Sequence, residues 1–211
     1  RIYYTGSFWA LLNPFALLVG VFSLLMFINQ GACYLQMKTE APLRQRAEAV
    51  SLISASLAAV LFIAAGVWLA SAGMGYKVTS VIDSNAINSA VTKTVEVSSG
   101  AWLSNYESYP LLWIFPLLGV AAFLVSALCS KLAKGWQAFV ASSLAIVGVI
   151  MTYGVSMFPF IMPSSSMPNH SLTMWDATSS ELTLKIMFVV ACIFVPIIPV
   201  SYTHLTLPTK A

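Results

Sequence analysis

Long apolar stretches separated by shorter polar connections dominate the chain. Five of them reach about 20 residues or more, at positions of about 14–37, 47–74, 110–129, 136–158 and 180–200. A hydrocarbon core about 30 Å thick needs about 20 residues of helix at 1.5 Å per residue. Backbone polar groups in lipid must be bonded within their own segment, so each stretch is expected to be helical. The pattern predicts an all-α fold, a polytopic transmembrane helical bundle with five spans.

Local signals mark the starts of the first and last spans. Asn13 is placed as an N-cap, with Pro14 at the first helical position. Thr178 and Glu181 have the spacing of a capping box, and Glu181 precedes Lys185 in the favourable i,i+4 order. We interpret Lys185 as a lysine that reaches the membrane interface, and the alternative is a buried functional charge.

Composition agrees with lipid as the main solvent. Hydrophobic residues make up 59% of the 211 residues and charged residues 8%, whereas soluble domains carry about 25% charged residues. The net charge of +3 is dispersed and excludes a nucleic-acid-binding surface. Cys33, Cys129 and Cys192 fall in or at the ends of apolar segments without a paired motif, which indicates packing.

Basic residues predict the orientation. The connections at 38–48 and 130–135 are expected to be cytoplasmic because positive charge favours that side, and they hold Lys38, Arg44, Arg46, Lys131 and Lys134. The connection at 75–108 mixes two lysines with three acids, and the one at 159–179 has neither Lys nor Arg. These two connections are expected to face outward, which alternates correctly across all five spans.

Candidate redox ligands are scarce in the sequence. Haem is held in membrane proteins by His or Met on spanning helices, but the two histidines are His170, in an outward connection, and His204, in the tail. Methionines without a partner histidine are interpreted as packing. The sequence lacks G-x-S-x-G, Walker and H-E-x-x-H motifs and acids in the middle of a span. We therefore predict no catalytic, cofactor-binding or metal-binding residue in this chain.

Amide side chains interrupt the first span. Asn29 and Gln30 lie well inside its apolar run, and Gln36 lies near its cytoplasmic end. Such amides are expected to hydrogen-bond a neighbouring helix. The alternative is that they line a quinone or proton path.

The outward connection between the last two spans is too apolar for a solvated linker. Pro159 and Pro163 stand among apolar residues, and Trp175 and Asp176 follow shortly before the last span. Trp175 suits the membrane interface, and Asp176 is expected to favour the positive end of the last helix. A cap that connects helices is the leading interpretation. The alternatives are a direct part in quinol or oxygen chemistry and contact with a partner subunit.

Several motifs, in order along the chain, resemble subunit II of cytochrome bd-type quinol oxidases from Arg1 to about Val200. They are Tyr3-Tyr4-Thr5-Gly6, Leu12-Asn13-Pro14-Phe15, Gly31-Ala32, Tyr34-Leu35-Gln36-Met37-Lys38-Thr39, Gly100-Ala101-Trp102-Leu103, Met157 to Ser165 and Leu172 to Leu184.

The resemblance implies a subunit of about nine spans, with residues 1–200 as its C-terminal transmembrane half and last five spans. It implies a haem-free subunit II that supports a haem-bearing subunit I in the bacterial inner membrane, in aerobic respiration and proton-motive-force generation. Haem b, haem d and a quinone would then belong to the complex, and this chain alone would not be catalytic. Structural or subunit-contact residues are expected at Asn13, Gln30, Trp102, Pro159, Pro163, Trp175 and Asp176.

Two other hypotheses remain, half of a membrane transporter or permease and a purely structural assembly subunit. A transporter should show broken helices or ionisable residues at the midplane. Residues 201–211 are expected to be a non-native tail, because Ser201 to Thr209 look like a translated sequencing adapter. The start at Arg1 suggests that upstream sequence is missing.

Overall fold

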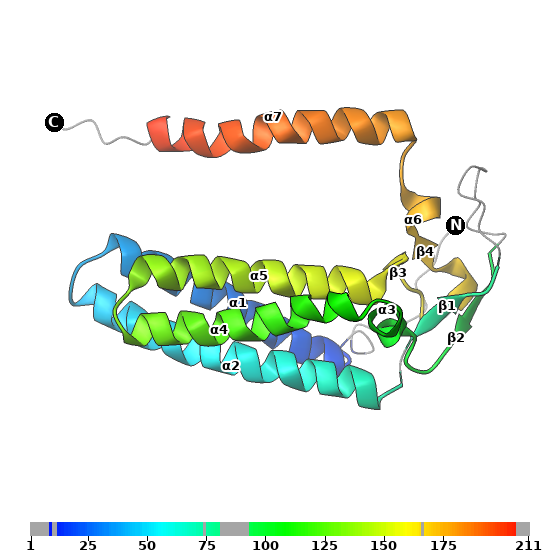
Figure 1. Cartoon of the computed structure of the whole chain (residues 1–211), viewed down its shortest axis with the longest axis horizontal. Coiled ribbons are helices and arrows are strands. Elements are labelled where there is room, and N and C mark those ends of the chain that lie inside the picture. The colour runs from blue at the N-terminus through cyan, green and yellow to red at the C-terminus, as the bar shows by residue number, and fades with distance from the viewer. Residues whose placement is uncertain (1–8, 10–11, 74, 81–92, 166, 206–211) are drawn as a thin grey trace.

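The computed structural model describes residues 9, 12–73, 75–80, 93–165 and 167–205, with side chains described as far as Ile198. Four antiparallel helices form a bundle, and a fifth long helix runs apart from it (Figure 1). The bundle consists of α1 (Pro14–Lys38), α2 (Leu43–Ser71), α4 (Ile114–Lys131) and α5 (Gly135–Met157), and the separate helix is α7 (Glu181–Leu205). All five are long and apolar enough to cross a membrane, once the 3-10 turn η3 (Pro110–Trp113) is counted with α4. The predicted polytopic helical bundle is confirmed.

Helix ends differ from the predicted spans by a few residues. Asn13 caps α1 as predicted, since its Oδ1 accepts the N–H of Phe15 at 3.1 Å. The second helix begins at Leu43, directly after Pro42, and ends at Ser71. Gly73 follows that end with a φ of 58°, a left-handed conformation that suits glycine after a helix. Residue 74, the predicted end of this span, lies outside the described residues.

The predicted capping of the last helix is wrong in two respects. The helix begins at Glu181, so Thr178 is too early to be its N-cap, and the Thr178 hydroxyl instead donates to the Met174 carbonyl at 2.6 Å. The capping box lies five residues earlier, where Thr173 and Asp176 cap the short helix α6 (Met174–Ala177). Asp176 therefore serves α6 and not the last helix.

Small side chains let the bundle helices approach closely. The core consists mainly of alanines from α2, α4 and α5, with Phe22 of α1 and Phe123 of α4 among them. A Cβ added to Gly148 of α5 would lie 2.7 Å from the backbone nitrogen of Gly119 on α4. Contacts between small residues are typical of helices packed in a membrane, where close approach replaces the hydrophobic effect.

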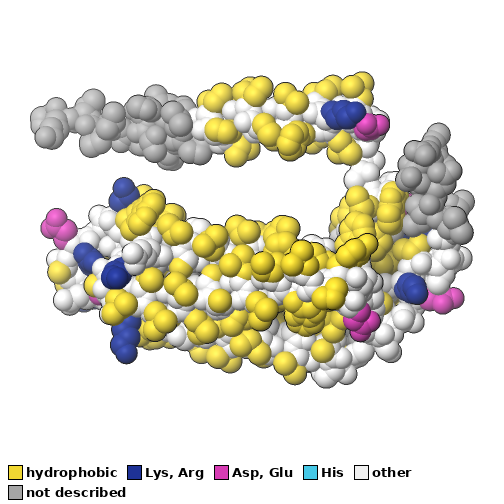
Figure 2. Space-filling view, viewed as in Figure 1, with side chains coloured by type: hydrophobic (Ala, Val, Ile, Leu, Met, Phe, Trp, Pro, Cys, Tyr) yellow, Lys and Arg dark blue, Asp and Glu magenta, His cyan; other side chains and the backbone are white. Residues whose placement is uncertain are grey.

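The two ends of the bundle differ in charge. The α1–α2 and α4–α5 connections lie at one end, which we call the basic end because it holds Lys38, Arg44, Arg46, Lys131 and Lys134. Figure 2 shows dark-blue side chains at that end and apolar side chains over the bundle walls and α7. We call the opposite end, where the short elements gather, the cap end (Figure 1). That the basic end is cytoplasmic stays a prediction.

Candidate functional site at the cap end of the bundle

The cap end contains two small antiparallel sheets that the sequence did not predict. One pairs β1 (Tyr76–Val78) with β2 (Val95–Val97), and the other pairs β3 (Phe160–Met162) with β4 (Leu172–Thr173). After β2 the chain forms η2 (Ala101–Leu103) and α3 (Ser104–Ser108), and η4 (Pro168–His170) lies between β3 and β4 in the sequence. The connection between the last two long helices is therefore folded onto the helix ends, as its apolar composition predicted.

Trp102 lies at the centre of the cap. Its side chain is buried, and its ring meets those of Tyr76 and Phe160 edge to face at centroid distances of 5.7 and 5.8 Å. Aromatic pairs in this arrangement contribute about 0.5–1.5 kcal/mol beyond the area that they bury. These three rings come from three separate segments, so Trp102 stabilises the cap by joining them.

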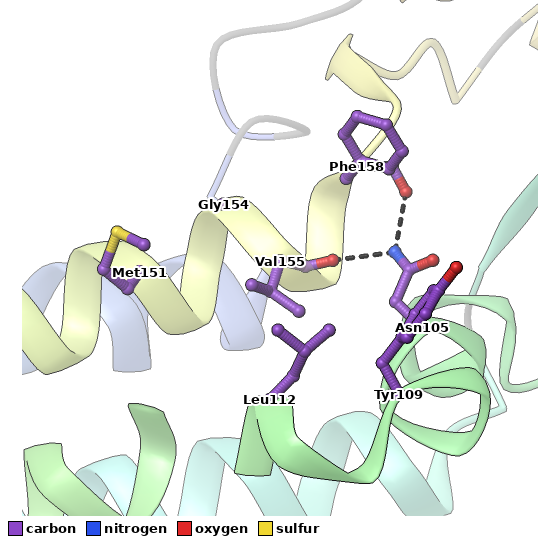
Figure 3. Close-up of a pocket in the computed structure, with 7 residues that line it drawn as sticks. All are labelled: Asn105, Tyr109, Leu112, Met151, Gly154, Val155 and Phe158. Carbon is purple, nitrogen blue, oxygen red and sulfur yellow. Dashed lines mark hydrogen bonds between the residues drawn. The ribbon is translucent and has the colours of Figure 1, made fainter. Parts of the chain in front are cut away.

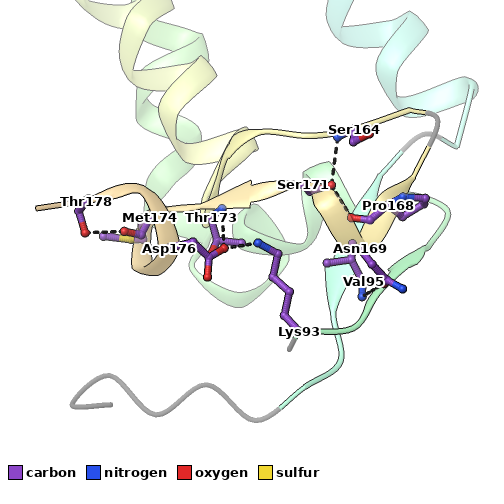
Figure 4. A network of polar contacts seen from close by, with 10 residues as sticks. All are labelled: Lys93, Val95, Ser164, Pro168, Asn169, Ser171, Thr173, Met174, Asp176 and Thr178. Atoms are coloured by element: carbon purple, nitrogen blue, oxygen red, sulfur yellow. Dashed lines mark hydrogen bonds and ion pairs between the residues drawn. The ribbon is translucent and has the colours of Figure 1, made fainter. Parts of the chain in front are cut away.

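A buried ion pair ties the two outward connections together. Lys93 Nζ contacts Asp176 Oδ2, and the two side chains are 5% and 4% exposed. The same carboxylate oxygen accepts the Thr173 hydroxyl at 2.7 Å and the Thr173 N–H at 3.2 Å (Figure 4). We call these three residues the Lys93–Asp176 latch. It connects positions 83 residues apart in the sequence.

The latch keeps Asp176 ionised. Burial raises the pKa of Asp176, but hydrogen bonds from Lys93 and Thr173 lower it by more, so the pKa lies below the ordinary range. A neighbouring bond strengthens the same junction, since the Val95 N–H donates to Asn169 Oδ1 at 2.8 Å (Figure 4). The latch and this bond together hold β2 against η4 and α6.

Five of the seven predicted residues meet at this end. Pro159 offers its carbonyl to the N–H of Met174 at 3.0 Å, and Pro163 follows β3 directly. Trp175 is half-buried, with its ring 6.2 Å from that of Phe158. With Trp102 and Asp176 these residues form the cap, and Asn13 lies exposed at the same end of α1.

Lys93 is the cap residue that the sequence analysis missed. It lies in a Ser- and Thr-rich run that is typical of a solvated loop. The available signal was charge complementarity, because Asp176 is the one acid in a connection without Lys or Arg, and the lysines that could neutralise it are in the other outward connection.

A shallow pocket opens beside the cap, between α3, η3 and the end of α5. It has a volume of about 350 Å³ and is lined by Asn105, Tyr109, Leu112, Met151, Gly154, Val155 and Phe158 (Figure 3). Its one amide is already committed, since Asn105 Nδ2 donates to the carbonyls of Val155 and Phe158 at 2.8 and 2.9 Å. The remaining lining is apolar except for the Tyr109 hydroxyl, and it contains neither a carboxylate nor a basic side chain.

Gln30 lies away from the cap, inside the bundle. Its Nε2 donates to Ser143 Oγ at 3.0 Å, and its Oε1 accepts the hydroxyl of Ser142, both on α5. Asn29 donates to Ser126 of α4 and Gln36 to Ser130 of α4. The amides of the first span therefore hydrogen-bond neighbouring helices, as predicted.

The residues of the bundle do not fit a haem. His170 is exposed in η4, outside the long helices. Over the described ranges, three or more His, Cys, Asp or Glu side chains nowhere gather in a way that could hold a metal ion. Phe22, Phe123 and the alanines fill the bundle core. A porphyrin between these four helices would displace that packing and would meet no histidine.

Sequence comparison identifies the family of the chain. The chain matches the family model described as cytochrome bd terminal oxidase subunit II over residues 1–207. It is 53% identical over 203 residues to "Probable cytochrome oxidase subunit 2" of Haemophilus influenzae, which covers 96% of this chain and 53% of that protein. It is 50% identical over 198 residues to "Cytochrome bd-I ubiquinol oxidase subunit 2" of Escherichia coli K12, which covers 94% of this chain and 52% of that protein. The chain spans about half the length of these curated relatives. It is a multi-pass membrane protein that belongs to the family of cytochrome bd terminal oxidase subunit II.

Proposed function

We propose that this chain is part of a haem-free subunit II of a quinol:oxygen oxidoreductase in the bacterial inner membrane. The family match over residues 1–207 carries the proposal. In this role the chain packs against a haem-bearing subunit I, whose haem b, haem d and quinol site perform the electron transfer that generates a proton-motive force. The chain itself contributes membrane helices and an ordered cap.

The side chains of the bundle support a structural role. Its walls are apolar, and its buried polar groups are amides, hydroxyls and the Cys33 thiol. The buried charged side chains of the described residues are Lys93 and Asp176, which pair with each other in the cap. The pocket beside the cap is lined mainly by apolar side chains. A redox or proton-transfer site would instead need titratable groups near its reacting atoms.

The same observations disfavour a transporter half. Transporters of this size build their sites from broken helices and ionisable residues at the midplane. Here α1, α2 and α5 are uninterrupted helices of 25, 29 and 23 residues. The acids and bases of the described residues lie at helix ends or in connections.

Purification of the full-length subunit with and without its partner subunit tests the proposal. The subunit alone is expected to show no haem absorbance, and the assembled complex is expected to show the oxidase spectrum. Stoichiometric haem in the subunit alone would refute the proposed division of labour.

A variant of the cap tests whether its role is structural. Combined Trp175→Ala and Asp176→Ala substitutions remove an aromatic contact with Phe158 and one partner of the latch. We expect the yield of assembled complex to fall several-fold while turnover per assembled complex stays near that of the wild type. The matched control is Met162→Ala, because Met162 is a cap residue with a 64% exposed side chain. Normal assembly with lost quinol oxidation would place the cap on the reaction path.

A further inference from the structure

The pocket beside the cap lies where two membrane-spanning segments meet the membrane surface. The span Pro110–Lys131 begins directly after Tyr109, and the span Gly135–Met157 ends directly before Phe158. Both of these flanking residues line the pocket. The lining residues that belong to the spans themselves are Leu112, Met151, Gly154 and Val155. The pocket therefore extends from the membrane surface at the cap end into the hydrocarbon core.

The edge of the pocket at the membrane surface is polar. Asn105 Nδ2 is committed to the carbonyls of Val155 and Phe158 at the end of α5 (Figure 3). The Tyr109 N–H donates to the Asn105 carbonyl at 3.0 Å, which places the two side chains on one face. Tyr109 is 69% exposed, and none of the described residues forms a hydrogen bond with its hydroxyl. This hydroxyl is therefore the donor that the edge offers to a bound molecule.

The rest of the pocket is apolar and reaches along α5. Met151 precedes the last residue of this helix, Met157, by six positions, or about 9 Å along the axis. The volume of about 350 Å³ is at the lower end of small-molecule sites, which span about 300–1,000 Å³. A helix with its side chains is about 10–12 Å across, so the pocket suits part of one linear hydrocarbon chain and not a further helix.

Gly154 keeps the pocket open beside α5. A Cβ added to Gly154 would meet no atom within 4 Å, whereas one added to Gly148 would lie 2.7 Å from the backbone of α4. Close packing between helices therefore explains the small size of Gly148 but not that of Gly154. A larger side chain at position 154 would enter the pocket and leave the contacts between the helices intact.

We propose that this pocket binds one acyl chain of a phospholipid from the leaflet at the cap end, and that the Tyr109 hydroxyl donates to an ester carbonyl of the same lipid. The chain fills the apolar part of the pocket, and the ester lies at the boundary, where tyrosine is favoured. Protein atoms contact this chain on more sides than they contact ordinary bilayer lipid, so dispersion holds it more tightly. The site does not depend on the reaction that the complex performs.

The polar edge favours a phospholipid over a quinone. A quinone ring carries two oxygens on opposite sides, and each needs a hydrogen-bond donor when it is bound in an apolar site. The described lining offers one uncommitted donor, the Tyr109 hydroxyl, because the Asn105 amide nitrogen already donates to two carbonyls. One donor is enough for a lipid ester, whose other oxygens remain at the membrane surface.

Photo-crosslinking in the assembled full-length complex tests the site. The complex is placed in vesicles of phosphatidylethanolamine and phosphatidylglycerol that contain some phosphatidylethanolamine with a diazirine in one acyl chain. It is then washed with detergent and unlabelled lipid, illuminated, and analysed by mass spectrometry. We expect adducts at Leu112 and Met151 to survive the wash. Adducts at Leu117, a 65% exposed residue of the same span that contacts ordinary lipid, should be lost.

Two variants and one matched control assign the adducts to the pocket. Gly154→Leu should reduce adducts at Met151 at least about fivefold, because leucine takes the space of the acyl chain. Tyr109→Phe keeps the ring and removes one hydrogen bond, so the labelled lipid should be lost roughly two- to tenfold faster during the wash. The control is Gly66→Leu, the same change near the cap end of α2, where an added Cβ also meets nothing within 4 Å. It should leave the adducts unchanged.

Three results would overturn the proposal. One is equal loss of adducts at Met151 and Leu117 during the wash, a comparison within the wild type that needs no variant to fold. Another is a Gly154→Leu complex with undiminished adducts at Met151. The third is a stoichiometric quinone in the solvent extract of the wild-type complex that is absent from the Gly154→Leu complex, because it would assign the pocket to a quinone.

Discussion

Removal of the Asp176 carboxylate should open the cap, because it leaves the Lys93 ammonium buried without its partner. The Lys93 and Asp176 side chains are 5% and 4% exposed, so solvent screens the pair weakly. Loss of one partner of such a pair costs about 3–5 kcal/mol, mainly as the penalty for the charge left behind. Asp176→Ala also removes the acceptor for the Thr173 N–H and hydroxyl.

Amide hydrogen exchange in the assembled complex measures this cost locally. The Val95 N–H, donated to Asn169, becomes free when the two outward connections separate. A loss of 3 kcal/mol raises the opening equilibrium constant roughly 150-fold, since about 1.4 kcal/mol corresponds to a factor of ten. We therefore expect Val95 to exchange at least about 100-fold faster in Asp176→Ala. Amides in the middle of α5 should be unaffected, because local openings are independent of the bundle.

Two further variants distinguish the cost of leaving a buried charge unpaired from the cost of lost packing. Glu181→Ala breaks an ion pair with Lys185 whose side chains are 82% and 71% exposed, and it should cost only about 0.3–0.5 kcal/mol. Combining Lys93→Met with Asp176→Leu removes both buried charges and should recover most of the lost protection. The reasoning fails if Asp176→Ala has no larger effect than Glu181→Ala, or if the double variant opens more readily than Asp176→Ala.

Three other outcomes follow from the structure. The folded pKa of Asp176 lies below its unfolded value of about 3.9. The stabilisation from the latch should therefore be complete above about pH 4 and disappear as the pH falls through the lowered pKa. Acid-dependent opening of the cap that persists in Asp176→Asn would contradict this. Gly148→Ala forces a Cβ to within 2.7 Å of the α4 backbone and should cost about 1–3 kcal/mol in thermal denaturation, whereas Gly31→Ala, with open space around it, should be neutral or stabilising. Cysteines at the exposed positions Arg46 and Glu96 should be labelled from opposite membrane faces, and labelling from one face would refute the topology.

The helices could be predicted from the sequence because their cause is local. A segment that crosses lipid must be apolar for about 20 residues and must satisfy its own backbone, and both requirements are visible in consecutive residues. Asn13 was identified as a cap because the residue and its partner, the Phe15 N–H, are two positions apart. The side-chain amides of α1 were expected to form hydrogen bonds with neighbouring helices because lipid offers no hydrogen-bond partner.

The cap could not be predicted in the same way, because its stabilising contacts join distant segments. Lys93 looks like a solvated lysine until Asp176, 83 residues later, is placed beside it. The capping box illustrates a second limit. Thr178 with Glu181 and Thr173 with Asp176 share one spacing, and the pattern alone does not decide which pair begins a helix. The paired strands are too short, at two or three residues, for an alternation of apolar and polar residues to show.

Because α7 is attached only through the cap, a small rotation of the cap moves the far end of this long helix by a larger distance. Its described apolar side chains are exposed on all sides, and the chain reaches it from α6 through three residues, 178–180. At 1.5 Å per residue its 25 residues extend about 37 Å. A tilt of about 10° at the cap would therefore displace the far end by about 6 Å. Side chains at the cap end thus determine where the far end of this helix lies, and even a few degrees of rotation in the cap moves that end by about 2–3 Å.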